Sequence, residues 1–256
     1  MDFLHPTTPF NLEGKAVIIP VVSTANVAQL AVDLIIASFS LQRVAVFDSS
    51  FLVPVVGARE DDQKGITTPL ELYGHPSIDF VVVQQRSPVL KSRKQDFIES
   101  LLEFIKVSNF GAALFLSGVD LSNRTDAQML TPTYQVRPTN GTSLASTPLE
   151  SLLTLPIPIY TSPVQQRSQE GAESNTISFI PGGGLTRRML SSIPAGWNIP
   201  TAGLLQFVLE GDNRADAGML ASVVAKVFGK DITQWRQPGS WRDGLFGTPH
   251  DQTLYG

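Results

Sequence analysis

The sequence contains no cysteine. Disulfide bonds, thiolate metal ligands and cysteine nucleophiles are therefore all excluded. Histidine is scarce as well: His5, His75 and His250 are far apart in the chain, and each lies next to a proline. Because no two histidines have the spacing of ligands on one helix, we expect no histidine-based metal site.

Concentrated positive charge is also missing. The chain has 19 Lys and Arg residues against 23 Asp and Glu residues, and no run of Lys or Arg exceeds two. A phosphate backbone is bound by clustered basic residues, so we expect no nucleic-acid partner. No apolar stretch reaches the roughly 18 residues that a membrane-spanning helix needs, and the N-terminus lacks the apolar run of a signal peptide. We therefore expect no membrane partner and a location in the cytosol or nucleus.

The composition is that of a globular protein. Hydrophobic residues make up 42% of the chain and charged residues 16%, which is enough apolar material for a substantial core. The length of 256 residues fits one large domain. We predict a single domain over residues 1–246, with a loop-rich insertion at 120–175 that is rich in Ser, Thr, Pro and Gln, and a flexible C-terminal tail at 247–256.

The first half of the chain predicts an α/β fold with a mainly parallel central sheet flanked by helices. Residues 16–22 form a continuous apolar run, which is typical of a strand covered on both faces. A helix follows with Asp33 as its only charge, so most of its circumference must be covered. Two strand-helix-strand units are predicted. Their strands are 16–22, 43–47, 80–85 and 112–117, their helices are 27–39 and 94–107, and a further short strand is 70–73.

The second half is predicted from weaker patterns. A strand at 177–180 leads into a helix at 185–192, followed by helices at 200–209 and 215–228. Within the insertion, residues 126–130 predict a helical turn and 156–159 an extended piece. Residues 232–246 have no periodicity but contain Trp235, Trp241 and Phe246. We expect these aromatic side chains to hold that segment against the body of the domain.

Three local patterns could carry chemistry, and each has a structural interpretation. Residues 181–184, Pro-Gly-Gly-Gly before a helix, could cradle a phosphate, but neither P-loop nor dinucleotide spacing follows, so tight strand-to-helix packing is favoured. Ser117 lacks the Gly-x-Ser-x-Gly context of a nucleophile elbow. Glu210 and Asp212 lie between two predicted helices, where capping is favoured. We therefore expect no enzyme, no catalytic or metal-binding residue and no cofactor.

Two segments suggest contacts with other proteins. The loop at residues 51–57 is apolar where a polar loop would be expected, and two interpretations stay open: it packs over the sheet edge, or it meets a partner. The tail is polar from Gly247 to Thr253 and then ends in Leu254, Tyr255 and Gly256. An apolar pair at the end of a polar tail suggests a segment that is inserted into a pocket elsewhere.

Several stretches taken together resemble the proteasome assembly chaperone 2 family. They occur in the same order and span residues 16 to about 246, whereas 120–175 matches poorly. The stretches are NVAQLAVDLI at 26–35, LVPVVG at 52–57, IPGGGLT at 180–186, FVLEGDN at 207–213 and SWR at 240–242.

This resemblance implies a fold related to nucleoside-phosphorylase-like sheets without an enzyme's site. It also implies a heterodimer with proteasome assembly chaperone 1 that binds the α-subunit ring of the 20S proteasome, promotes its assembly and prevents off-pathway association. Family members, notably fungal ones, end in a hydrophobic-Tyr-any tail that docks between α subunits. The matching residues here are Leu254, Tyr255 and Gly256. The alternative is a phosphorylase- or hydrolase-like enzyme for small molecules on the same fold.

Overall fold

Strand β2 (Ala16–Pro20) lies at the centre of the sheet, and all five of its residues are buried. The computed structural model describes residues 3–60, 64–163 and 177–242. Eight strands form one sheet in the order β1-β3-β6-β7-β2-β8-β10-β9. The other seven are β1 (Leu4–Pro6), β3 (Gln42–Phe47), β6 (Leu70–Gly74), β7 (Phe80–Gln85), β8 (Ala112–Asp120), β9 (Thr133–Val136) and β10 (Thr201–Val208).

The middle of the sheet is parallel and its two sides are antiparallel. Strands β7, β2, β8 and β10 pair in parallel, while β1, β3 and β6 on one side and β9 on the other join by antiparallel pairing. A two-stranded hairpin of β4 (Gly57–Ala58) and β5 (Ile66–Thr67) is separate from this sheet. The predicted fold class, with a mainly parallel central sheet, is confirmed.

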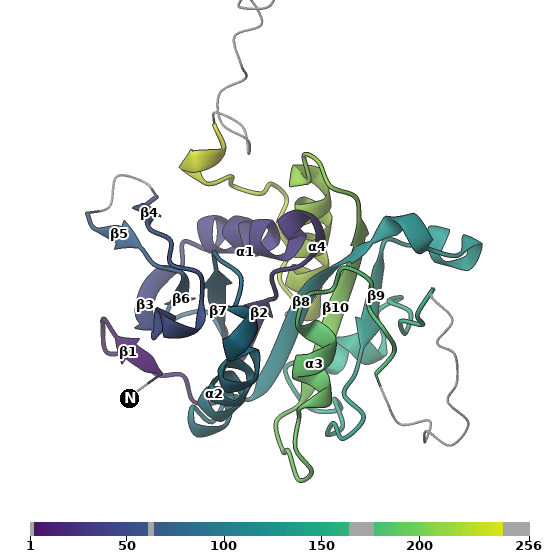
Figure 1. Cartoon of the computed structure of the whole chain (residues 1–256), viewed down its shortest axis with the longest axis horizontal. Helices are drawn as coiled ribbons and strands as arrows, with labels where there is room; N and C mark the ends of the chain where they lie inside the picture. Colours follow the sequence, from purple (N-terminus) through teal and green to yellow (C-terminus); the bar gives the residue numbers. More distant parts are fainter. Residues whose placement is uncertain (1–2, 61–63, 164–176, 243–256) are drawn as a thin grey trace, which may run out of the picture.

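Helices cover both faces of the sheet (Figure 1). One core cluster joins Ile18 to residues of α1 (Val27–Ser38) and α4 (Arg214–Val227). The other joins Ile19 to residues of α2 (Lys94–Val107) and α3 (Thr186–Ser191). Successive residues of a strand point to opposite faces, so β2 contributes to both clusters. Short 3-10 turns lie at Thr24–Asn26, Ser49–Phe51, Lys91–Arg93, Leu121–Asn123, Asp126–Met129, Glu150–Leu153 and Gly239–Trp241.

The predicted helix at 200–209 is wrong, because this segment is strand β10. All eight of its residues are buried, and it lies between β8 and β9. A strand covered on both faces is a continuous apolar run, and periodicity does not separate such a run from a buried helix. The pairing of Leu204 with Leu116 in β8 is the long-range information that the local pattern lacks.

The predicted strand at 177–180 is also wrong. Ile177 and Ile180 are buried, but the segment belongs to no ladder. The two positions beside β8 are taken by β2 and β10, so this stretch has no strand next to it to pair with. It is held instead by contacts such as the bond from the Tyr160 hydroxyl to the Phe179 carbonyl (3.0 Å).

Part of the loop-rich insertion belongs to the main sheet. Strand β9 pairs with β10, and its Tyr134 and Val136 are buried. The predicted turn is present as Asp126–Met129, and Ile159 forms an isolated bridge with Gln135. The described residues 120–163 of this segment therefore contribute an edge strand that the sequence analysis did not predict.

Candidate functional site

The predicted proteasome-binding residues Leu254, Tyr255 and Gly256 lie outside the described residues, as does Phe246. The structure does describe the segment that leads to them. We call residues 229–242, from the end of α4 to Arg242, the tail base. In Figure 1 this segment is yellow and crosses the side of the molecule where α1 and α4 lie.

The tail base is tied to both helices. Trp241 is only 4% exposed and belongs to the core cluster that contains α1 and α4. The indole nitrogen of Trp235 donates to the hydroxyl of Ser222 in α4 (2.9 Å), and the backbone N–H of Arg236 donates to the hydroxyl of Ser38 at the end of α1 (2.9 Å). The predicted anchoring roles of Trp235 and Trp241 are confirmed.

A third connection comes from the loop after β4. The carboxylate of Glu60 accepts a hydrogen bond from the backbone N–H of Ser240 (3.1 Å). Residues that are distant in the sequence thus hold the tail base at three places, on α4, on α1 and on this loop. The point from which the chain continues towards residue 256 is therefore fixed relative to the domain.

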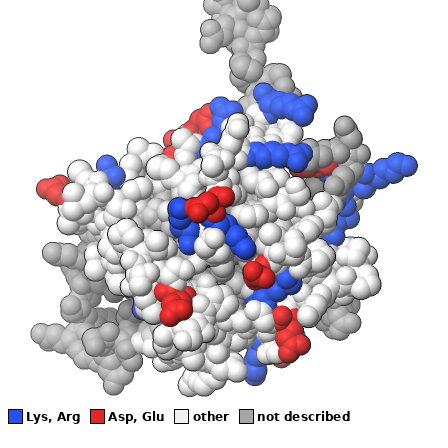
Figure 2. Space-filling view, turned by 180° about the vertical axis from the view of Figure 1, so that it is seen from behind, with Lys and Arg blue, Asp and Glu red and all other residues white. Residues whose placement is uncertain are grey.

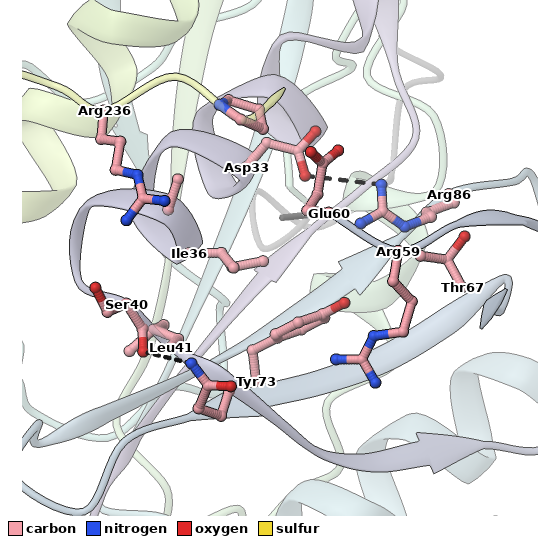
Figure 3. A pocket seen from close by; sticks show the side chains of 13 residues that line it. Asp33, Ile36, Ser40, Leu41, Arg59, Glu60, Thr67, Tyr73, Arg86 and Arg236 are labelled. Carbon is pink, nitrogen blue, oxygen red and sulfur yellow. Dashed lines mark hydrogen bonds and ion pairs between the residues drawn. The ribbon is translucent and has the colours of Figure 1, made fainter. Parts of the chain in front are cut away.

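A pocket of about 140 Å³ lies beneath the tail base (Figure 3). The tail base contributes Arg236 and Pro238, α1 contributes Asp33 and Ile36, and the sheet side contributes Tyr73. Figure 3 shows Glu60 beside Asp33, with Arg86 joined to Asp33 by a dashed line. The remaining lining residues are Ala37, Ser40, Leu41, Gln42, Arg59 and Thr67.

Asp33 is the central charge of this pocket. Arg86 lies 3.7 Å from its carboxylate, and the side-chain amide of Gln84 donates to it at 2.5 Å. Burial nevertheless raises the pKa of Asp33 from the usual 3.8 to about 6, against the lowering effects of Arg86 and Gln84, and the negative charge of Glu60 adds to the rise. The carboxyl that the sequence singles out as the only charge of its helix is therefore poised to titrate near pH 6.

Another carboxylate lies next to this pocket. Glu71 is fully buried and pairs with Arg43 at 2.7 Å, while the Tyr73 hydroxyl donates to it at 2.7 Å. Burial, together with the charge of Glu71 and this hydrogen bond, raises the pKa of Tyr73 to about 12. Glu71 also accepts from the backbone N–H of Thr68 (3.0 Å), so both of its carboxylate oxygens have partners. We interpret this cluster as a link between β3 and β6.

The usual ligand position of such a sheet is filled by the chain itself. Strand β2 leads through α1 towards β3, whereas β8 leads towards β10 on the other side. Open α/β sheets bind ligands outside the carboxyl ends of strands at such a switch point. Here residues 181–184 lie in that place: the carbonyl of Gly182 accepts from Thr24 N–H (2.9 Å), and that of Pro181 accepts from Asp120 N–H (2.9 Å).

The glycines of this loop are required by close approach. Gly182 and Gly184 have φ of +69° and +58°. A Cβ on Gly182 would lie 1.9 Å from the Thr24 hydroxyl oxygen, and one on Gly184 would lie 2.0 Å from the Val22 carbonyl oxygen. The packing interpretation of residues 181–184 therefore holds, and the glycines close the crevice.

The other chemical candidates have structural partners. Ser117 is fully buried, and the single hydrogen of its hydroxyl is shared between two acceptors, the carbonyls of Gly118 (3.1 Å) and Gly183 (3.2 Å). The carboxylate of Glu210 accepts from Ala25 N–H (2.9 Å), in a turn where Ala25 has φ of +60°. Asp212 forms an ion pair with Arg214. These residues support turns and strand ends.

Potential metal ligands, helix hydropathy and surface charge further characterise the described part of the chain. Across residues 3–60, 64–163 and 177–242, no group of three or more His, Asp or Glu side chains is arranged to hold a metal ion. No helix in these same ranges has the length and apolarity needed to span a bilayer. On the face drawn in Figure 2, acidic and basic side chains lie close together between wide uncharged areas.

The described residues define an open α/β domain whose switch-point crevice is closed by its own glycine loop and whose last segment is anchored before it leaves. Residues 17–166 match the sequence model of the PAC2 family, and the chain belongs to this family. A relative from Xenopus tropicalis named proteasome assembly chaperone 2 is 33% identical over 246 residues, covering 90% of this chain and 91% of the relative. The human protein of the same name is 31% identical over 274 residues, covering 96% of each.

Solved structures show the same fold. Pyrococcus furiosus PbaA, described as an archaeal homolog of proteasome-assembly chaperone, matches with a TM-score of 0.64 and 16% identity over 90% of this chain and 84% of that one. Pyrococcus furiosus PbaB, described as an archaeal proteasome activator, matches with a TM-score of 0.58 and 15% identity over 91% of both chains.

Some residues of the site escaped the sequence analysis. Ser38, Ser222 and Glu60 are ordinary surface residues in their local context, and their roles arise only from pairings across many residues of chain. Asp33 did carry a signal, as the only charge in an otherwise covered helix. Nothing local connected it to Arg86 or to the tail base.

Proposed function

We propose that this protein is a proteasome assembly chaperone that acts by binding rather than by catalysis. In this proposal it forms a heterodimer with proteasome assembly chaperone 1 in the cytosol or nucleus. The heterodimer binds the α-subunit ring of the 20S proteasome, promotes its assembly and prevents off-pathway association. Membership of the PAC2 family and the names of the curated relatives support the assembly role.

The observation that carries the mechanism is the anchored tail base. After Arg242, 14 residues remain to Gly256, and they span up to about 45 Å when extended. We propose that Leu254 and Tyr255 enter a pocket between adjacent α subunits and that the terminal carboxylate of Gly256 meets a cationic side chain there. A fixed starting point limits the volume that the end of the tail has to search.

The energies favour a weak, reversible contact. Burial of Leu254 and of the Tyr255 ring contributes about 1.5–3 kcal/mol each, and a charge-assisted bond to the carboxylate about 1.5–3 kcal/mol. Ordering of the tail offsets much of this gain. A second docking contact in the heterodimer would raise avidity on the order of 10²-fold through effective concentration.

Deletion of Leu254, Tyr255 and Gly256 tests the mechanism. We expect the affinity of the heterodimer for isolated α rings to fall about tenfold or more, with an unchanged melting temperature and an unchanged heterodimer. Biolayer interferometry measures the first effect, and size-exclusion chromatography with light scattering measures the second. The matched control replaces Asp251, Gln252 and Thr253 with alanine and keeps the end of the chain. An unchanged affinity after the deletion removes the tail from the mechanism.

A further inference from the structure

The apolar loop at residues 51–57 and the β7–α2 connection at residues 86–93 are joined into one surface, which we call the wall. The first residues of the loop, Phe51 and Leu52, are buried, and Leu52 forms an antiparallel bridge with Val89. The backbone N–H of Leu90 donates to the Phe51 carbonyl (2.9 Å). The Val53 carbonyl accepts from the Ser87 hydroxyl (2.6 Å). The start of the loop is therefore bonded to the β7–α2 connection. This supports the first of the two interpretations of the loop, that it packs on the domain.

Beside this wall lies an apolar pocket of about 450 Å³ at the carboxyl edge of the sheet. Val21 and Val22 reach it from the end of β2, Val53 and Val89 from the wall, and Leu185 from the start of α3. The volume accommodates a large aliphatic or aromatic side chain. Beyond the pocket the same loop leaves Val55 and Val56 37% and 75% exposed, so apolar surface continues outwards from it.

The rim of this pocket is positively charged. Lys91 and Lys94 line it, whereas no acidic residue does. Among the described residues, neither lysine forms an ion pair within 4 Å, while the neighbouring Arg93 is paired with Asp96 (2.9 Å). Arg188, on α3, is hydrogen-bonded to Gln95 (2.9 Å). An apolar depression with two uncompensated cations at its edge is complementary to an apolar side chain with a carboxylate beside it.

We propose that this surface, formed by the pocket, its lysine rim and Val53, Val55 and Val56, binds the partner subunit of the heterodimer. The partner segment inserts one large apolar side chain into the pocket and places an Asp or Glu side chain against Lys91 and Lys94. Contiguous exposed apolar surface with a polar rim is the usual composition of a protein interface. This inference rests on the proposed heterodimer and adds the place and chemistry of its contact.

Charge reversal tests the rim. In the full chain, Lys91→Glu with Lys94→Glu replaces both cations, and acidic residues at the start of a helix do not oppose its dipole. We expect the Kd for the purified partner subunit to rise at least tenfold. Its salt dependence should change sign, because salt screens the attraction in the unaltered chain and the repulsion in the variant. The control is Lys106→Glu at the other end of α2, an exposed lysine that does not line the pocket, and it should leave Kd within twofold.

A second pair of variants tests the apolar part. Val56→Asp places a charge on the exposed loop and should raise Kd at least tenfold. Val107→Asp, at a residue that is 67% exposed at the end of α2, should leave Kd within twofold. Circular dichroism and the melting temperature of each variant establish that the fold is retained.

The outcomes of these binding experiments distinguish a failure of the proposed surface from a failure of the proposed heterodimer. Values of Kd within twofold for both test variants overturn the proposal, as does an effect on self-association or on α-ring binding without an effect on the heterodimer. Failure of the unaltered chain to bind the partner subunit overturns both this surface and the pairing part of the proposed function. The tail-deletion assay on α rings is independent of that result.

Discussion

Two loops lie against the same α/β body and are held in opposite ways. The glycine loop at residues 181–184 is fixed by backbone bonds and by contacts too close for a side chain. The tail base is fixed by side chains, through Ser222, Ser38 and Glu60, above a pocket with titratable groups. In the glycine loop, backbone bonds and close packing leave no room for a side chain, and the crevice stays closed. The tail base has Asp33 in the pocket beneath it, a carboxyl whose pKa of about 6 makes this region sensitive to pH.

The largest effect on stability should come from adding a side chain to the glycine loop. Gly184→Ala puts a methyl group 2.0 Å from the Val22 carbonyl oxygen at a φ of +58°. We expect a loss of about 2–5 kcal/mol in the free energy of unfolding, from backbone strain and overpacking together. Urea denaturation measures it.

Gly229→Ala is the matched control, because Gly229 has nearly the same φ (+61°) with open space around it. This substitution introduces the backbone strain without overpacking, so it should lower the free energy of unfolding by about 1–2 kcal/mol. Equal losses in the two variants would mean that the glycine loop is not tightly packed.

The second-largest effect should be a pH dependence of the free energy of unfolding, caused by Asp33 in the pocket beneath the tail base. The pKa of Asp33 is about 6 in the folded protein against 3.8 when exposed, so the folded state binds more protons between these values. The free energy of unfolding should therefore fall as pH rises from about 4 to about 6, by up to about 3 kcal/mol, and then level off. Asp33→Asn should remove this fall. Denaturation curves at pH 4, 5, 6 and 7 measure it, and parallel pH profiles for the two proteins would contradict the assignment.

The smallest effect should come from the third connection of the tail base. Glu60→Ala removes the acceptor for Ser240 N–H, which is worth about 1 kcal/mol or less. Because the loss is local, we expect faster hydrogen exchange at Ser240 and an almost unchanged global stability. The same variant should lower the pKa of Asp33, since the charge of Glu60 raises it. Unchanged exchange at Ser240 would show that Glu60 does not hold the tail base.

The sequence predicted elements well where the interpretation chosen for the local pattern agreed with the packing in the folded domain. The amphipathic stripe of α2 and the all-buried run of β2 were both identified with nearly the observed bounds. Strand β10 was mistaken for a helix because its burial on both faces depends on β8 and β9, which are far away in the sequence. Strand β9 was missed because its polar Thr133 and Gln135 are buried only through distant partners, such as Gln206 and the Ile157 carbonyl.

The same distinction applies to the site. Large apolar side chains in an otherwise featureless segment identified Trp235 and Trp241 as anchors, because burying an indole is favourable in almost any context. The hydrogen-bond partners of the tail base could not be identified in this way. A serine or glutamate has many possible roles, and only the folded arrangement selects one.

The place of β9 in the sheet sets an order for folding during synthesis. Among the described residues its ladder partner is β10, which is made later in the chain. Until Thr201–Val208 has left the ribosome, Thr133–Val136 lacks this partner, and the flank of β8 that β10 covers stays open. A nascent chain that pauses between these two segments therefore presents an unsatisfied sheet edge, and such edges are prone to aggregation.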